Sequence, residues 1–212
     1  MIIMIAGTSH TGKTLLAQRL LELTKFPYLS IDHLKMGLIR SGNTTLTPCD
    51  DAELTDYLWP IVREMIKTAI ENNQNMIVEG CYIPYSWKDD FTEEYLCHIH
   101  CRWLIMTSAY IKNHFSDIQL HGSDIENRLD DSWLEPTILI EDNETNLQNC
   151  QLHNCEYILI DDTYEIPVDW CISGLNSGNG GTYEKYSGTW QYRFHWNSDA
   201  GCGTPYAGEA AY

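Results

Sequence analysis

The sequence predicts an α/β fold built on a five-stranded parallel sheet. Short apolar runs with the length of strands alternate with longer segments whose apolar residues recur every three or four positions. This alternation is typical of β-α-β units, in which consecutive strands run parallel. The first apolar run, residues 1–6, is continuous rather than alternating, as expected for a strand that is buried on both faces. A glycine-containing loop and a leucine-rich helical segment follow it directly.

The elements follow in order along the chain. The apolar runs predict strands over residues 1–6, 27–32, 76–80, 102–106 and 156–161. Helical spacing of apolar residues predicts helices over residues 14–24 and 50–71. We also expect helices over residues 33–40, 108–115 and 133–150. Pro60 should kink the helix over residues 50–71 or mark its effective start. The polar stretch 116–132 contains Gly122 and several acids, so we expect a mobile loop or lid there.

The composition changes near residue 168. Residues 168–212 are rich in Gly, Tyr, Trp and Ser and show no helical period. They could form a small β-hairpin appendage, a disordered tail or a non-native extension. We therefore expect one α/β domain over residues 1–167 and a separate C-terminal tail over residues 168–212.

The charge balance excludes several classes of function. The chain has 13 basic and 30 acidic residues, a formal net charge of −17. This argues against binding to nucleic acids, whose phosphates demand a basic face, and against docking on anionic membranes. No apolar run approaches the roughly 18 residues of a membrane helix. The apolar start Met1–Ala6 is too short for a signal peptide, and the 8 cysteines are scattered, so we expect a cytoplasmic protein with reduced thiols.

The strongest motif is a phosphate-binding loop. The segment Gly7-Thr8-Ser9-His10-Thr11-Gly12-Lys13-Thr14 matches GxxxxGK[ST] in full, between a buried strand and an amphipathic helix. The glycines let backbone N–H groups point at a phosphate chain, and the helix directs its positive N-terminus there. Lys13 supplies a cation, and the Thr14 hydroxyl can ligate Mg²⁺. These residues predict binding of ATP and Mg²⁺; the chain has no N-K-x-D motif for guanine. His10 could touch the γ-phosphate or the acceptor, or face solvent.

The loop, an acid after the second strand, a polar lid and a short fifth strand resemble the P-loop kinases of small molecules. These include adenylate and shikimate kinases and the bacterial proteins related to 2-phosphoglycerate kinase or zeta toxin. The resemblance covers roughly residues 1–165 and implies a three-layer P-loop fold. It also implies transfer of the γ-phosphate of MgATP to a small metabolite.

Four further residues are candidates for this chemistry. Asp32 closes the second strand; in the resembled kinases an acid here contacts the acceptor hydroxyl or a water on magnesium, and the same residue could cap a helix. Arg40 resembles the acceptor-phosphate arginine of nucleotide kinases, and Lys35 precedes it on the same helix; either could be an ordinary solvated cation. Glu79 ends the third strand, where parallel sheets bind ligands, and is a second candidate for magnesium or substrate contact.

Arg128 is the candidate lid residue. Arg128-Leu129-Asp130-Asp131 resembles the R-x-D-D at the end of the adenylate kinase lid, where the arginine contacts the transferred phosphate. Arg128 is also the only arginine or lysine between residues 114 and 150, whereas adenylate kinases carry more. The chemistry then depends on Lys13, Arg128 and Mg²⁺, or transfer is slow, or Arg128 only pairs with a neighbouring aspartate.

The sequence thus predicts an ATP-dependent kinase, with Lys13, Asp32 and Arg128 as catalytic residues. The acceptor could be a nucleoside monophosphate, a phosphorylated acid or another alcohol. The alternatives are an ATP-binding switch or slow ATPase without a small-molecule acceptor, and an inactive protein that only binds ATP. The segment Cys97-His98-Ile99-His100-Cys101 suggests zinc, but it lacks the paired C-x₂-C spacing of zinc sites. The sequence gives no indication of oligomeric state.

Overall fold

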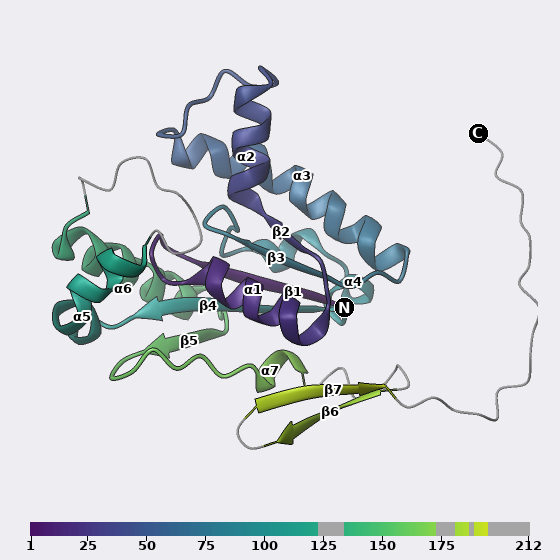
Figure 1. Ribbon diagram of the computed structural model, residues 1–212. Helices are drawn as coiled ribbons and strands as arrows, with labels where there is room; N and C mark the ends of the chain where they lie inside the picture. The colour runs from purple at the N-terminus through teal and green to yellow at the C-terminus, as the bar shows by residue number, and fades with distance from the viewer. Residues whose placement is uncertain (123–133, 173–180, 187–188, 195–212) are drawn as a thin grey trace, which may run out of the picture. The chain divides into compact units, whose positions relative to one another are not determined.

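The computed structural model describes residues 1–122, 134–172, 181–186 and 189–194 (Figure 1). The chain divides into two compact units, Met1–Val168 and Asp169–Tyr212. The first unit contains the sheet and the phosphate loop. The second unit contains the short helix α7 (Asp169–Ile172) and an antiparallel hairpin of β6 (Gly181–Tyr186) and β7 (Thr189–Phe194).

The first unit is built on a sheet whose five strands all run parallel. The strands lie in the order β2-β3-β1-β4-β5. Their bounds are β1 (Ile2–Gly7), β2 (Tyr28–Ser30), β3 (Met76–Gly80), β4 (Ile99–Met106) and β5 (Tyr157–Ile160). The α/β class and the parallel five-stranded sheet predicted from the sequence are confirmed. The first strand occupies the centre, so every residue from Ile2 to Gly7 is buried, which explains its continuous apolar sequence.

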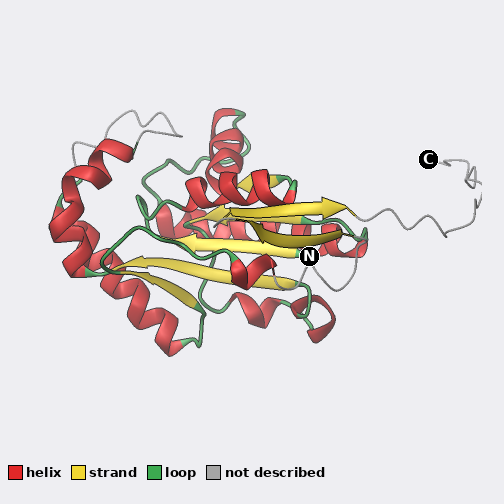
Figure 2. Cartoon of the chain, turned by 60° about the horizontal axis from the view of Figure 1, so that its bottom comes forward, coloured by secondary structure: helices red, strands yellow, loops and turns green. Residues whose placement is uncertain are grey.

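Helices cover both faces of this sheet (Figure 2). One core cluster joins Ile2, Met4 and Ala6 of β1 to apolar residues of the long helix α3 (Asp51–Glu71) and to Cys150 of α6 (Pro136–Leu152). Side chains alternate between faces along a strand, so Ile3 and Ile5 point to the opposite layer, and both are fully buried. The helices are α1 (Lys13–Thr24), α2 (Ile31–Arg40), α3 (Asp51–Glu71), α4 (Glu93–Leu96), α5 (Ser108–His121) and α6 (Pro136–Leu152).

The structure corrects three predicted elements. Helix α5 continues to His121, so residues 116–121 are helical rather than part of a loop. The reason is that Ile111 and Ile118, two turns apart, are both buried. Helix α2 begins at Ile31, so Asp32 lies in the first turn of that helix and not at the end of a strand. Pro60 lies inside α3, which begins at Asp51, so of the two predictions for Pro60 only the effective start is contradicted.

The carboxyl ends of β1, β2 and β3 meet at one edge of the sheet. The register pairs Ser30 of β2 with Glu79 of β3, and Glu79 with Ile5 of β1. The segments that leave these strands therefore begin side by side: the phosphate loop, helix α2, and the stretch that follows Gly80. This edge positions the candidate site. Among the described residues, no helix is long and apolar enough to cross a membrane.

Candidate functional site

The loop between β1 and α1 has the backbone conformation that its glycines allow. Gly7 has φ +140° and Gly12 has φ +79°, conformations that residues with a side chain rarely adopt. A Cβ atom on Gly7 would lie 2.6 Å from the backbone oxygen of Leu104. Gly12 is the N-cap of α1, so the first N–H groups of that helix open onto the loop. The two motif glycines are thus required by geometry, and the loop leads into a helix N-terminus suited to an anion.

Lys13 lies over the loop. Its Nζ donates a hydrogen bond of 2.6 Å to the backbone oxygen of Thr8, and the Thr11 hydroxyl donates one of 2.9 Å to the same oxygen. Lys13 is only 6% exposed. The lysine charge is therefore held at the centre of the turn by the loop's own backbone. Phosphate oxygens are stronger acceptors than a carbonyl because they carry charge, and they can replace this contact.

Two residues that the sequence analysis missed support the loop from outside. The Tyr164 hydroxyl donates a hydrogen bond of 3.0 Å to the backbone oxygen of Thr11. The amide of Asn143, on α6, contacts the Thr8 hydroxyl at 3.3 Å and accepts a bond of 2.8 Å from the backbone N–H of Met106. Asn143 is 1% exposed, so it ties the loop to the end of β4 from within the core.

A sequence signal existed for one of these two residues. Tyr164 comes shortly after the fifth strand, and residues at the carboxyl ends of parallel strands line the ligand edge. Burial raises the pKa of Tyr164, so its hydroxyl stays protonated and can donate. Asn143 gave no signal, because a polar residue inside an amphipathic helix is normally assigned to its exposed face.

The Thr14 hydroxyl lies against the carboxylate of Glu79. Thr14 Oγ1 is 3.4 Å from Glu79 Oε2, and Glu79 is 1% exposed. The pairing of β3 with β1 produces this contact, since it brings the end of β3 next to the start of α1. A hydroxyl and a carboxylate at this position are the oxygen ligands that Mg²⁺ prefers.

Asp32 and Lys35 belong to a second group of polar contacts, which also contains Tyr82 and Asp51. Lys35 Nζ donates to Asp32 Oδ1 at 2.5 Å and to the Tyr82 hydroxyl at 2.9 Å. The Tyr82 hydroxyl in turn donates to Asp51 Oδ1 at 3.0 Å. Burial, together with the charges of Asp51 and Asp32, raises the pKa of Tyr82, so the phenol remains a donor. We call these four residues the α2–α3 polar network.

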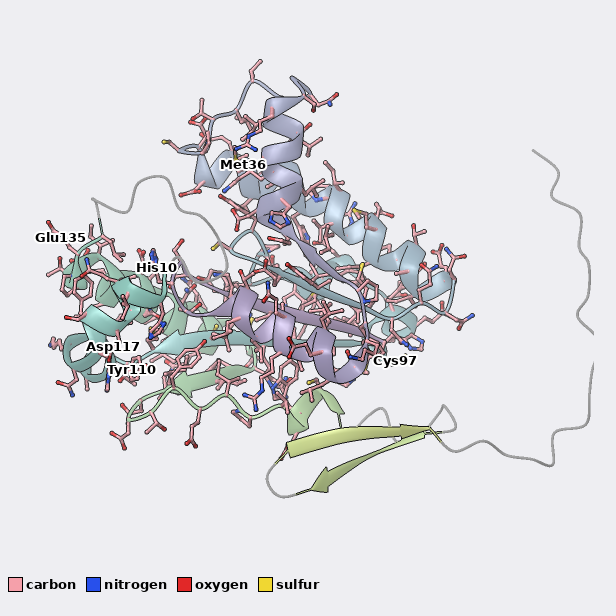
Figure 3. The ribbon with its side chains drawn as sticks, viewed as in Figure 1. His10, Met36, Cys97, Tyr110, Asp117 and Glu135 are labelled. Atoms are coloured by element: carbon pink, nitrogen blue, oxygen red, sulfur yellow. The ribbon has the colours of Figure 1, made fainter. Side chains whose placement is uncertain are left out.

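The structure also places two other candidates, Arg40 and His10. Arg40 is exposed at the end of α2, eight residues after Asp32, which is about 12 Å along the helix. The ring of His10 lies next to Gly122 at the end of α5, where a Cβ atom would be 3.2 Å from it. Figure 3 shows His10 on the side of the loop toward α5 and α6. Arg128 lies outside the described residues.

The cysteines and histidines do not gather into a metal site. Within the part of the chain that the structure describes, no group of three or more His, Cys, Asp or Glu side chains is arranged to hold a metal ion. Cys97 and His98 are exposed, whereas Ile99 and Cys101 are buried in β4.

No family model and no curated protein sequence matches this chain, but solved structures do. A deoxyadenosine kinase from M. mycoides is similar at 13% identity and TM-score 0.49, covering 84% of this chain and 100% of that one. A gluconokinase from Sinorhizobium meliloti 1021 has 14% identity and TM-score 0.45, covering 82% and 90%. Shikimate kinase from Aquifex aeolicus has 15% identity and TM-score 0.34, covering 72% and 99%.

No argument rests on these likenesses, since each of the three TM-scores is below 0.5 and each identity is 15% or less. No residue role is carried over from these proteins.

Proposed function

We propose that this chain is a kinase that transfers the γ-phosphate of MgATP to the hydroxyl of a small molecule. One observation carries the proposal: a complete GxxxxGKT loop, with both glycines at φ values that demand glycine, connects the central strand to the N-terminus of α1. Such a loop presents backbone N–H groups, a lysine and a helix N-terminus to a phosphate chain.

The residues of the loop would each have a distinct role. Gly7 to Thr14 would surround the β- and γ-phosphates through their N–H groups. Lys13 would exchange its bond to the Thr8 oxygen for one to a phosphate oxygen, and would there stabilise the charge of the transferred group. Arg128, which the resemblance marks as a lid residue, would add a second cation. Little covalent chemistry is required, because phosphoryl transfer depends on positioning and electrostatics.

The donor set at the strand edge fits Mg²⁺. The Thr14 hydroxyl and the buried Glu79 carboxylate are both oxygen ligands and lie 3.4 Å apart. Bound with ATP, Mg²⁺ would neutralise charge on the β- and γ-phosphates. Glu79 would orient this site from β3 while Thr14 holds it from α1. The sequence marked Asp32 for magnesium as well, but the hydrogen bond to Lys35 makes Asp32 the better candidate for the acceptor hydroxyl.

The acceptor would lie between the phosphate loop and α2. Asp32 would accept a hydrogen bond from the attacking hydroxyl and orient it toward the γ-phosphate. Lys35 would fix the orientation of Asp32 through their short contact. A nucleoside monophosphate was one acceptor suggested by the sequence, on the strength of Arg40 and Arg128. We propose the cytoplasm as the location, as the scattered cysteines suggest.

The test is a binding and transfer experiment on the full chain. ATP affinity is measured by titration calorimetry with and without Mg²⁺, and GTP serves as a comparison. The fate of γ-labelled ATP is then followed by product separation with a broad mixture of metabolites and with water alone. Label on an acceptor above the water control supports the kinase. Absence of ATP binding contradicts the assignment of residues 7–14 as a phosphate-binding loop. Label found only as inorganic phosphate favours the alternative function, a slow ATPase or an ATP-binding switch.

A further inference from the structure

From the charges around the α2–α3 polar network, we infer that the acceptor is an alcohol without negative charge, such as a neutral polyol, a nucleoside or an amino alcohol. This inference rests on the proposed function and narrows its substrate class. It excludes acceptors that carry a phosphate or carboxylate group, nucleoside monophosphates included. The phosphate loop defines where ATP would bind, and the α2–α3 polar network would provide the charged and polar groups around the acceptor.

The network adjoins the phosphate loop through the sheet. Asp32 follows Ser30 at the end of β2, and Tyr82 follows Glu79 at the end of β3. Ser30 and Glu79 are paired in register, and Glu79 contacts Thr14 of the loop. Figure 1 shows α2 and α3 above the sheet on the β2 and β3 side, and α5 and α6 on the side of β4. A molecule that reaches the γ-phosphate from the α2 side therefore meets this network.

The one cation of the network is already neutralised. Lys35 Nζ lies 2.5 Å from an oxygen of Asp32 and donates also to Tyr82, which is itself bonded to Asp51. The side chain of Lys35 is 12% exposed and that of Asp32 is 34% exposed. The lysine is thus enclosed, whereas the carboxylates remain open to solvent. Two carboxylates and one ammonium leave a net charge of −1 facing an acceptor.

Four other cations of the described part of the chain make contacts away from this network. Arg63 pairs with Asp90 and Glu64, Lys67 with Glu64, and Arg102 with Glu156. Lys88 donates to the backbone of Asn154. Arg40 lies eight residues after Asp32, about 12 Å along α2, and Lys13 lies over the loop, where it would face the phosphates of ATP.

An acceptor phosphate would therefore face carboxylates, while hydroxyl groups would find hydrogen-bond acceptors. At the effective dielectric constant of a protein surface, two like charges about 4 Å apart weaken binding by at least about tenfold. Carboxylate oxygens accept bonds from several hydroxyls at once, which favours a polyol.

The experiment compares two pools of small alcohols that share the same hydroxyl groups. One pool contains nucleosides, sugars, glycerol and amino alcohols; the other contains the corresponding monophosphates and hydroxy acids. The full chain is given γ-labelled MgATP with each pool, after ATP binding has been established by calorimetry. We expect label in the uncharged and cationic pool at a rate at least about tenfold above the anionic pool.

The outcomes separate this inference from the proposed function. Faster labelling of the anionic pool overturns the inference and leaves the kinase intact. If the chain binds no ATP, the assignment of residues 7–14 as a phosphate-binding loop is wrong. If label is released only as inorganic phosphate, both the proposed kinase activity and this inference are wrong.

A variant that reverses the charge of one network residue gives a second test, in which wild type and variant are compared. Asp51→Lys should lower the ratio of kcat/KM for a neutral alcohol to kcat/KM for its phosphate ester by about tenfold, and added salt should reduce the change. The matched control is Asp56→Lys, an exposed residue on the same helix that makes the same charge change. An unchanged ratio in Asp51→Lys, or an equal change in both variants, contradicts the inference.

Discussion

The hydroxyl of Tyr164 occupies the space that a side chain on Gly12 would need. A Cβ atom on Gly12 would lie 1.6 Å from that hydroxyl oxygen, while the same hydroxyl donates to the backbone of the adjacent Thr11. The glycine of the motif is therefore required here by a tyrosine that comes from the far end of the first unit, in addition to its φ of +79°. This contact makes the loop depend on residues outside the motif.

Gly12→Ala should abolish detectable ATP binding. The added methyl must displace Tyr164 or the loop, and alanine at positive φ is strained by about 1 kcal/mol or more. Calorimetric titration with MgATP measures the loss. In the background Tyr164→Ala, the same substitution should cost less affinity, because the steric conflict is gone and only the backbone strain remains.

Gly37→Ala is the control for this substitution. Gly37 lies in the interior of α2, and nothing lies within 4 Å of a Cβ atom built there. Alanine should stabilise that helix by about 0.5–1 kcal/mol and leave ATP affinity unchanged. Equal affinities for Gly12→Ala and Gly37→Ala would show that the loop does not hold the phosphates.

Lys13→Ala should weaken ATP binding strongly or abolish turnover. The lysine is buried over the loop and is the described cation closest to the expected phosphates, so its removal leaves their charge uncompensated. ATP affinity and release of γ-label are measured together. The comparison variant is Arg19→Ala, an exposed cation on the same helix, which should change neither quantity. If Lys13→Ala has the ATP affinity and the γ-label release of the wild type, residues 7–14 are not a phosphate-binding loop.

Glu79→Gln should raise the concentration of Mg²⁺ needed for half-maximal ATP binding, with a smaller effect on binding of ATP without metal. The amide keeps the shape of the carboxylate but loses the charge that attracts a divalent cation. Its control is Glu71→Gln, the exposed last residue of α3. If both variants show the same magnesium dependence as wild type, Glu79 has no part in the metal site.

The sequence predicted the sheet and the loop well, and the surroundings of the loop poorly. The continuous apolar run of β1 and the motif after it each have a local cause, so they can be read from neighbouring residues. The contact between Tyr164 and Gly12 joins residues far apart in the chain, and no local pattern indicates it. The sequence placed Asp32 at the end of a strand, whereas its pairing with Lys35 and its position inside α2 depend on where the helix starts. Tertiary packing decides that start, since Ile31 is fully buried.

His100 should make the free energy of unfolding fall at acidic pH. Burial in β4, followed by the charge of Arg102, lowers the pKa of His100 below its ordinary value near 6.5. The unfolded chain then binds a proton at a higher pH than the folded chain, so stability falls as the pH drops below about 6.5. Urea unfolding at pH 7.5 and 5.5 should show a smaller fall for His100→Gln than for wild type. His98→Gln, on an exposed neighbour, should behave as wild type.

Truncation after Val168 should leave a folded protein that binds ATP. The five strands of the sheet, the helices α1 to α6, and Tyr164 all precede this point, and Met1–Val168 forms a compact unit of its own. We expect one cooperative transition in thermal unfolding and the ATP affinity of the full chain. A chain that ends at Glu165 also lacks Ile166 and Val168, which are 6% and 2% exposed. Since burial of each such side chain contributes about 1.5–3 kcal/mol, the shorter chain should unfold at a clearly lower temperature. If the chain that ends at Val168 already lacks cooperative unfolding, residues 169–212 contribute to the core of the first unit.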